Sequence, residues 1–179
     1  MNHNEIQTIA WQDLDEATTN LCISLWHLIW PNDTNTLERA KRMSSEANFL
    51  HSHHVHLLIE KGSLLTLARS FRQRILLGGN EMDILALAGV CTHPSQRGLG
   101  LGKLVVQEAW KQLKSTDDLS LFQTEVPGFY VKLGARLINN AIISSKKVTR
   151  SFWDPYVMIY PNSLVWEDSM QVDLLGDGW

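Results

Sequence analysis

One stretch decides the fold of this chain: Thr92-His93-Pro94-Ser95-Gln96-Arg97-Gly98-Leu99-Gly100-Leu101-Gly102-Lys103. It follows an apolar run, residues 84–91, that is short enough for a buried strand, and it precedes an amphipathic pattern typical of a helix. Because its glycines have no side chains, they allow close approach to the backbone and permit positive φ angles. The N–H groups of such a turn and of the helix N-terminus together favour a bound anion. The stretch therefore predicts a strand, a glycine turn and a helix around an anion site.

Length and composition indicate a folded protein with a substantial core. The chain has 179 residues, which matches the usual size of one domain, and 44% of them are hydrophobic. This apolar share argues against a disordered chain. The formal net charge is −3. Without a strongly basic patch, nucleic acid is not expected to be the main partner.

The cysteines and the N-terminal segment predict a compartment. Cys22 and Cys91 both lie in apolar runs and are interpreted as reduced core thiols rather than a disulfide framework. Residues 1–19 are acidic and polar and do not resemble a signal peptide. No apolar run approaches the roughly 20 residues that a membrane span needs. We therefore expect a soluble cytoplasmic protein with no membrane partner.

Hydrophobic periodicity predicts the remaining elements. The expected helices cover residues 14–30, 36–47 and 100–114, with a short one that begins at Pro127. The expected strands cover residues 6–10, 55–60, 64–77, 84–92, 119–124, 137–144 and 152–160. Gly89 inside one strand indicates a bulge or a close backbone approach. Residues 161–179 are expected to form an irregular tail.

A histidine group precedes the second expected strand, and it includes His51, His53, His54 and His56. Alternate residues share a face of a strand, so a metal site must be considered. No Cys, Asp or Glu lies nearby to complete a ligand set. The pattern favours a polar loop that runs into a strand, with a role in a substrate site as the alternative. We predict no metal.

Three kinds of phosphate-binding loop compete for the glycine stretch. The P-loop needs a Gly at position 97 and a Ser or Thr at position 104, where this chain has Arg97 and Leu104. The dinucleotide fingerprint needs a third Gly at position 103, where Lys103 stands. The segment from Arg97 to Gly102 instead matches the pattern Gln/Arg-x-x-Gly-x-Gly/Ala in full.

A second segment supports this last pattern. Residues 127–136 read Pro-Gly-Phe-Tyr-Val-Lys-Leu-Gly-Ala-Arg, which contains an aromatic residue, Tyr-x-Lys-x-Gly, a hydrophobic residue and Arg. Together with the order of the expected elements, the two segments resemble the GNAT superfamily of acyl-CoA-dependent N-acyltransferases. The resemblance implies an α/β (α+β) GNAT fold, with a mixed, mostly antiparallel central sheet of six to seven strands and about four flanking helices. It also implies one GNAT acetyltransferase domain over residues 1–179.

The resemblance assigns binding roles along the opening stretch, with acetyl-CoA as the co-substrate. In the family, the backbone of the fourth strand pairs with the pantetheine arm, which here implies Val90, Cys91 and Thr92. The pyrophosphate lies on the glycine loop, which implies a set of seven residues: Arg97, Gly98, Leu99, Gly100, Leu101, Gly102 and Lys103. The charge of the two basic residues and the helix dipole suit a diphosphate.

Two catalytic roles follow from the same resemblance. Tyr130 matches the family's general acid, which protonates the leaving thiolate; the alternative is a core aromatic beside Phe129. The general base is open, because the expected strand lacks the Glu that many members carry there. The candidates are Glu125, Asp83, Glu81 and the histidines, of which we select Glu125. Cys91 is interpreted as strand packing, since the family chemistry needs no acyl-enzyme.

The predicted function is transfer of an acetyl group from acetyl-CoA to a primary amine of a small molecule or peptide. The amine attacks directly in a ternary complex. The alternative is a non-catalytic module of the same fold that binds acyl-CoA for a regulatory or structural purpose. The acceptor cannot be identified from the sequence. Trp26, Trp30, Trp153 and Asp154 suit a cationic or aromatic amine but also suit ordinary packing, which we prefer. The tail is expected to cover either the sheet or the second copy in a homodimer.

Overall fold

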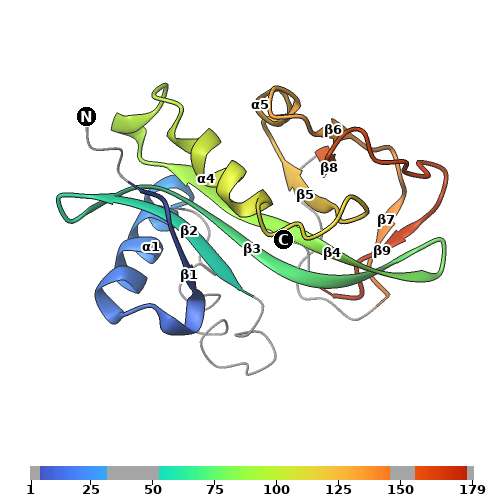
Figure 1. Ribbon diagram of the computed structural model, residues 1–179, viewed down its shortest axis with the longest axis horizontal. Helices are drawn as coiled ribbons and strands as arrows, with labels where there is room; N and C mark the ends of the chain where they lie inside the picture. The colour runs from blue at the N-terminus through green and yellow to red at the C-terminus, as the bar shows by residue number, and fades with distance from the viewer. Residues whose placement is uncertain (1–4, 32–52, 146–155, 177–179) are drawn as a thin grey trace. The chain divides into compact units, whose positions relative to one another are not determined.

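The computed structural model describes residues 5–31, 53–145 and 156–176 (Figure 1). The chain divides into two compact units, one of Met1–Phe71 with Gly89–Lys111 and the other of Arg72–Ala88 with Gln112–Trp179. The helix expected over residues 36–47 lies outside the described residues, as do His51, Trp153 and Asp154. The expectation of one domain over residues 1–179 stays a prediction.

The first unit is built on antiparallel strands. Strand β1 (Gln7–Ala10) pairs with β2 (His54–Glu60), and β2 pairs in turn with the first part of β3 (Ser63–Leu77). Val55 and Leu57 on β2 alternate with His54 and His56, so the two pairs occupy opposite faces. A register shift after Leu58 locally disturbs the β2–β3 pairing.

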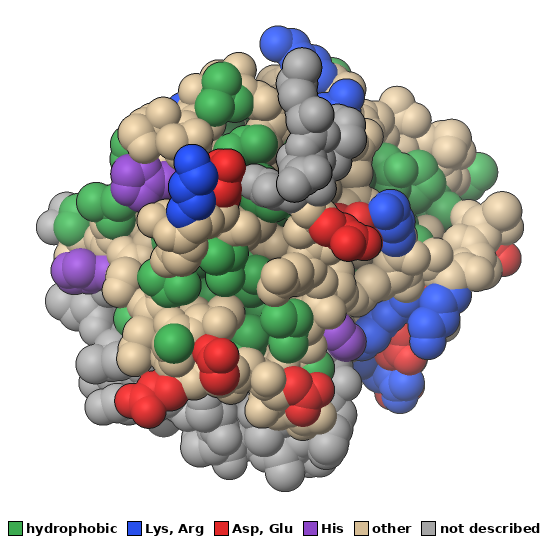
Figure 2. Space-filling view, turned by 60° about the vertical axis from the view of Figure 1, so that its left-hand side comes forward, with side chains coloured by type: hydrophobic (Ala, Val, Ile, Leu, Met, Phe, Trp, Pro, Cys, Tyr) green, Lys and Arg blue, Asp and Glu red, His purple; other side chains and the backbone are tan. Residues whose placement is uncertain are grey.

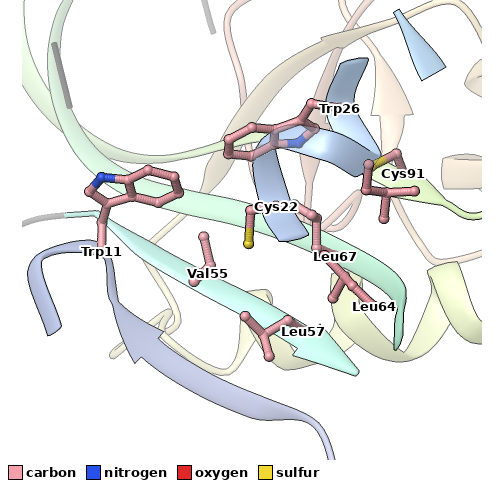
Figure 3. Packing of buried hydrophobic residues seen from close by; sticks show 9 residues of the cluster. Trp11, Cys22, Trp26, Val55, Leu57, Leu64, Leu67 and Cys91 are labelled. Carbon is pink, nitrogen blue, oxygen red and sulfur yellow. The ribbon is translucent and has the colours of Figure 1, made fainter. Parts of the chain in front are cut away.

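Helix α1 (Glu16–Ile29) covers one face of these strands. Asp15 caps it by accepting a hydrogen bond from the N–H of Thr18 at 2.6 Å, and the helix ends before Pro31, as its sequence predicts. Figure 3 shows the resulting core, in which α1 packs on the strands. Its buried members are Trp11, Cys22, Leu25, Trp26, Val55, Leu57, Leu64, Leu67 and Cys91. The two cysteines are free and buried, as predicted.

Helix α4 (Leu101–Trp110) follows the glycine turn and contacts β2. It buries an apolar stripe of Val105, Val106, Ala109 and Trp110. It ends four residues earlier than the sequence predicts, where the N–H of Lys111 donates to the carbonyls of Glu108 and Ala109. The strand, turn and helix predicted around the glycines are therefore confirmed.

The second unit contains the second part of β3, most of β4 (Asn80–Thr92) and β5 (Ser120–Thr124). Gly78 and Gly79, with φ of +57° and +86°, form the turn between β3 and β4. β5 pairs in parallel with β4 and antiparallel with β8 (Tyr156–Tyr160), which also pairs with β6 (Arg136–Leu137). The short helix α5 (Pro127–Val131) begins at Pro127, as predicted.

The C-terminal segment contains a strand that was not expected. β9 (Val172–Asp173) pairs antiparallel with β3 and in parallel with β7 (Ile142–Ile143). The single strand expected over residues 137–144 is instead divided into β6 and β7. The reason is Asn140, whose side-chain amide donates to the carbonyls of Glu167 at 2.8 Å and Met170 at 2.7 Å. This amide anchors the C-terminal segment at the point where the strand is divided.

The mixed, mostly antiparallel sheet of the prediction is confirmed, with the strand order β1-β2-β3-β4-β5-β8-β6 and β9 beside β3 and β7. Nine strands occur among the described residues instead of six to seven, because of the division at Asn140 and the added β9.

Three α-helices lie in the described ranges, together with short 3₁₀ helices at Trp11–Asp13 and Pro94–Gln96. In these ranges, no helix has both the length and the apolar character needed to cross a membrane. Figure 2 shows acidic and basic side chains side by side on one face.

Two members of the histidine group belong to the core. His56 is fully buried, with Nδ1 2.9 Å from Thr8 Oγ1 and Nε2 2.8 Å from Ser70 Oγ. His53 is also buried and stacks on Phe71, with ring centroids 4.3 Å apart. Burial lowers the pKa of His56 to about 4 and that of His53 to about 2. These histidines are therefore neutral structural residues rather than exposed bases.

The buried histidines predict a loss of stability in mild acid. A histidine whose pKa is lower in the folded than in the unfolded state makes its full contribution to the free energy of unfolding above the unfolded pKa of about 6.5. This contribution is lost as the pH falls toward 4. For His56 the full contribution to the free energy of unfolding is about 3 kcal/mol. Urea unfolding at pH 7 and pH 5 should show a smaller free energy of unfolding at pH 5.

The matched variants locate this effect. His56→Gln keeps a side chain that can bond both hydroxyls but does not titrate, so the difference between pH 7 and pH 5 should shrink by about 2 kcal/mol. His27→Gln removes an exposed histidine of α1 and should keep the wild-type difference, because the buried histidines remain. An unchanged difference in His56→Gln would contradict the assignment.

Candidate functional site

The candidate site begins where β4 is deformed at Gly89. This residue has φ of +57°, and its carbonyl accepts a hydrogen bond from the indole Nε1–H of Trp26 at 2.9 Å. A Cβ at Gly89 would lie 2.9 Å from Trp26 Nε1, closer than real contacts allow. The close backbone approach that the sequence predicts at Gly89 is therefore confirmed. Only glycine fits both this φ angle and this contact.

Hydrogen bonds with β3 hold the end of β4, residues Val90 to Thr92. The hydroxyl of the buried Thr66 donates to the carbonyl of Cys91 at 2.9 Å and lies 2.9 Å from Thr92 Oγ1. The N–H of His93 donates to the carbonyl of Leu65 at 2.8 Å. The end of β4 is thereby anchored to its neighbour by one main-chain and two side-chain hydrogen bonds.

Cys91 faces the core and Val90 and Thr92 do not. Its side chain belongs to the cluster that α1 covers, and burial raises the pKa of its thiol well above the usual range. The interpretation of Cys91 as strand packing is confirmed. Val90 and Thr92 are half-buried. Cys91 can therefore contribute only its backbone to a ligand.

A short turn leads from β4 to the glycines. The 3₁₀ helix Pro94–Gln96 is capped by His93, whose Nδ1 accepts a hydrogen bond from the N–H of Ser95 at 3.3 Å. Arg97 is exposed, and its Nε donates to the carbonyl of Thr92 at 3.4 Å. This contact keeps the guanidinium beside the end of β4.

The glycines open the N-terminus of α4. Gly98 and Gly100 have φ of +81° and +78°, and a Cβ at either position would have no neighbour within 4 Å. The Gly100 carbonyl accepts the N–H groups of Lys103 at 3.1 Å and Leu104 at 3.4 Å. The first two N–H groups of the helix, at Leu101 and Gly102, have no acceptor among the described residues. They can therefore bind an anion at the positive end of the helix dipole.

The other residues of the turn differ in exposure, charge and backbone conformation. Lys103 is exposed on the first turn of α4, and Leu99 is 66% exposed. Gly102 is helical and has no positive φ. The glycines thus act differently: Gly98 and Gly100 provide the backbone conformation, whereas Gly102 belongs to the helix itself. The turn combines unpaired N–H groups with two exposed cations, Arg97 and Lys103.

Tyr130 lies in the second unit, on α5. It is 5% exposed, and its ring contacts Phe122 and Phe129, with centroid distances of 4.6 Å and 4.8 Å. The backbone carbonyl of Tyr130 accepts hydrogen bonds from Leu133 and Ala135. The ring is therefore held rigidly, as either interpretation of this residue requires. The role of its hydroxyl stays a prediction.

Glu125 also lies in the second unit, between β5 and α5, and it is exposed. The next residue is held by a hydrogen bond from the N–H of Val126 to Thr124 Oγ1 at 3.0 Å. The alternative bases Asp83 and Glu81 are both engaged by Arg74, at 2.7 Å and 3.0 Å. The hydrogen bond from Arg74 lowers the pKa of Asp83, which makes it a weaker base. Glu125 keeps its predicted role as the candidate base.

Two residues of the site have a role that the sequence does not predict. Trp26 and Thr66 hold the carbonyls of Gly89 and Cys91. The glycine inside the strand pattern was the indirect signal for Trp26, because it indicated that something approaches the backbone. Among the described residues, no three His, Cys, Asp or Glu side chains gather as a metal-ligand group.

Solved structures with the same fold are known. A GCN5-related N-acetyltransferase from Kribbella flavida has a TM-score of 0.59 at 17% identity; the match covers 76% of this chain and 34% of that protein. An acetyltransferase of the GNAT family from Staphylococcus aureus Mu50 has a TM-score of 0.57 at 18% identity, covering 87% and 98%. An aminoglycoside 6′-N-acetyltransferase complexed with coenzyme A has a TM-score of 0.60 at 13% identity, covering 90% and 99%.

These structures establish the likeness in fold. The chain spans about a third of the length of the Kribbella flavida protein. No curated protein matches the sequence significantly. The sequence itself matches the family described as acetyltransferase (GNAT) domain over residues 11–138, which is more than half of the chain. The deformed strand, the glycine turn and α4 all fall within this match, and the chain belongs to the GNAT acetyltransferase family.

Proposed function

We propose that this protein transfers an acetyl group from acetyl-CoA to a primary amine of a small molecule or peptide. The observation that carries the proposal is the N-terminus of α4, where the N–H groups of Leu101 and Gly102 are unpaired within the described residues. The acyltransferase family and the solved relative that contains coenzyme A support acetyl-CoA as the ligand.

The residues of the first unit fit an acyl-CoA. The turn from Gly98 to Gly100 has no side-chain atoms that would block a diphosphate, and Arg97 and Lys103 supply positive charge. Val90 and Thr92 would present main-chain groups to the pantetheine arm, which would bind like an added strand. These are the residues predicted from the sequence.

The proposed chemistry is direct aminolysis of a thioester. The amine nitrogen forms a bond to the acyl carbon, the carbon–sulfur bond breaks, and the sulfur leaves with the bonding electron pair. Tyr130 donates its hydroxyl proton to this sulfur, and Glu125 accepts a proton from the amine, directly or through water. Of the two main-chain donors considered, Val90 and Cys91, the N–H of Val90 would polarise the thioester carbonyl, because the carbonyl of Cys91 is bonded to Thr66 on β3 and its main-chain groups therefore face that strand. Glu125 then releases its proton to solvent, and solvent restores the proton of Tyr130.

The test combines binding with turnover. Calorimetry should show binding of acetyl-CoA and of coenzyme A, and a panel of amines that includes aminoglycosides, polyamines and peptides should be screened for release of free thiol. Binding with thiol release for at least one amine supports the proposal. Binding without release across the panel supports the non-catalytic module. A protein that binds neither acetyl-CoA nor coenzyme A contradicts both functions.

A further inference from the structure

We propose that Trp26 is a positioning residue for the acyl-CoA site: its indole holds the Gly89 carbonyl so that the end of β4 stays open to the pantetheine arm. This inference rests on the proposed function. It concerns a residue of α1 that does not belong to the glycine turn or to the second signature segment. Its basis is a set of contacts within the first unit.

The contact between Trp26 and Gly89 combines a hydrogen bond with direct packing. The indole N–H donates to the Gly89 carbonyl at 2.9 Å. A Cβ at Gly89 would lie 2.9 Å from Nε1, 3.2 Å from Cε2 and 3.3 Å from Cζ2, so the edge of the ring covers the glycine. The Gly89 carbonyl is thus held by a side chain of α1. Together with φ of +57°, this bends β4 immediately before Val90.

Trp26 is itself held in place. It is 6% exposed and stacks on Trp11, with ring centroids 5.7 Å apart and an interplanar angle of 18°. Figure 3 shows both indoles above the β2 and β3 side chains of the same core cluster. A donor that is packed in this way cannot follow a moving carbonyl. It therefore fixes the position of Gly89.

Thr66 and Leu65 fix the next residues on the other side. Thr66 holds the Cys91 carbonyl, and Leu65 accepts the N–H of His93, so Cys91 and His93 direct their main-chain groups toward β3. Residues of an antiparallel strand alternate between facing the partner and facing away. Val90 and Thr92 therefore direct their main-chain groups to the opposite edge of β4. This is the edge to which an extended pantetheine arm would add.

The consequence of losing the Trp26 bond is specific to one part of the ligand. Without the indole N–H, the Gly89 carbonyl loses its donor and the end of β4 can shift. The main-chain groups that bind the pantetheine arm would then be displaced, whereas the diphosphate site at α4 would be unchanged. We expect acetyl-CoA to bind about tenfold more weakly to Trp26→Phe. Binding of ADP, which has the diphosphate but no pantetheine arm, should be unchanged.

Trp11→Phe is the matched control. The two indoles stack on each other, so either substitution reduces the same ring contact, but only Trp26→Phe removes the bond to Gly89. Dissociation constants for acetyl-CoA and ADP should be measured for both variants well below their unfolding midpoints. The inference predicts weaker acetyl-CoA binding only in Trp26→Phe. Equal weakening in both variants, or an equal loss of acetyl-CoA and ADP binding in Trp26→Phe, would show that Trp26 is only a core residue.

Gly89→Ala gives a second test that does not depend on Trp26→Phe being well folded. The added methyl group meets the indole, so this variant should also bind acetyl-CoA weakly and ADP normally. Unchanged acetyl-CoA binding in Gly89→Ala would overturn the inference. The wild-type protein separates the two proposals: if it does not bind acetyl-CoA, the proposed function fails, whereas normal binding by both variants defeats only the role of Trp26.

Discussion

Gly100→Val is expected to abolish detectable binding of acetyl-CoA, with a dissociation constant raised at least about 100-fold. Gly100 has φ of +78°, a conformation that a β-branched residue adopts only at a cost of about 1–3 kcal/mol. Its N-cap position also places the new side chain beside the N–H groups of Leu101 and Gly102, which have no acceptor in the part of the chain that the structure describes. The valine would therefore both distort the turn and exclude the diphosphate. Calorimetric titration with acetyl-CoA measures the effect.

Gly62→Val is the matched control for this variant. Gly62 lies in the turn between β2 and β3, has the same φ of +78°, and would also have no neighbour within 4 Å of a Cβ. The two valines should therefore cost similar free energies of unfolding, but Gly62→Val should bind acetyl-CoA as the wild type does. If Gly100→Val kept its affinity, the diphosphate would not lie on this turn.

Tyr130→Phe is expected to lower kcat by about 10²–10⁴-fold with little change in acetyl-CoA affinity. The substitution removes the proposed general acid but keeps the ring that packs on Phe122 and Phe129. The thermal midpoint should therefore remain close to that of the wild type. Steady-state thiol release with a saturating amine gives kcat, and the loss should appear there rather than in the dissociation constant.

The control for Tyr130→Phe is Tyr156→Phe, which removes a tyrosine hydroxyl from the exposed part of β8 in the same unit. This variant should retain wild-type kcat. The pH profile adds an independent readout. If Tyr130 is the acid, the kcat of the wild type should decrease at high pH, and this decrease should disappear in Tyr130→Phe. An unchanged kcat in Tyr130→Phe would leave this residue as a core aromatic only.

Much of the fold could be predicted from local patterns. The apolar residues of α1 recur at helical spacing up to Pro31, and the glycine stretch separates a buried strand from an amphipathic helix. Both were confirmed, because helix periodicity and glycine conformations depend on a few neighbouring residues. The roles of Tyr130 and Glu125 came from the family resemblance rather than from such patterns, and they stay predictions.

The prediction was weaker where distant segments decide the local structure. Residues 137–144 show a continuous strand pattern, but the amide of Asn140 binds the carbonyls of Glu167 and Met170 and divides it. The short strand β9 has little pattern of its own and exists because β3 and β7 pair with it. The histidines His53 and His56 look polar in the sequence, but stacking and hydroxyl partners make them part of the core.

The sequence by itself determined the glycine turn and the helix after it, because glycine permits positive φ angles and has no side chain, and because the first N–H groups of any α-helix lack partners within it. It also indicated a bulge or a close backbone approach at Gly89. Only the tertiary structure decided what approaches: Trp26 from α1 binds the Gly89 carbonyl, and Thr66 from β3 binds that of Cys91. The physical reason is that a hydrogen bond between residues 63 positions apart depends on how α1 packs on the strands, which no local pattern encodes.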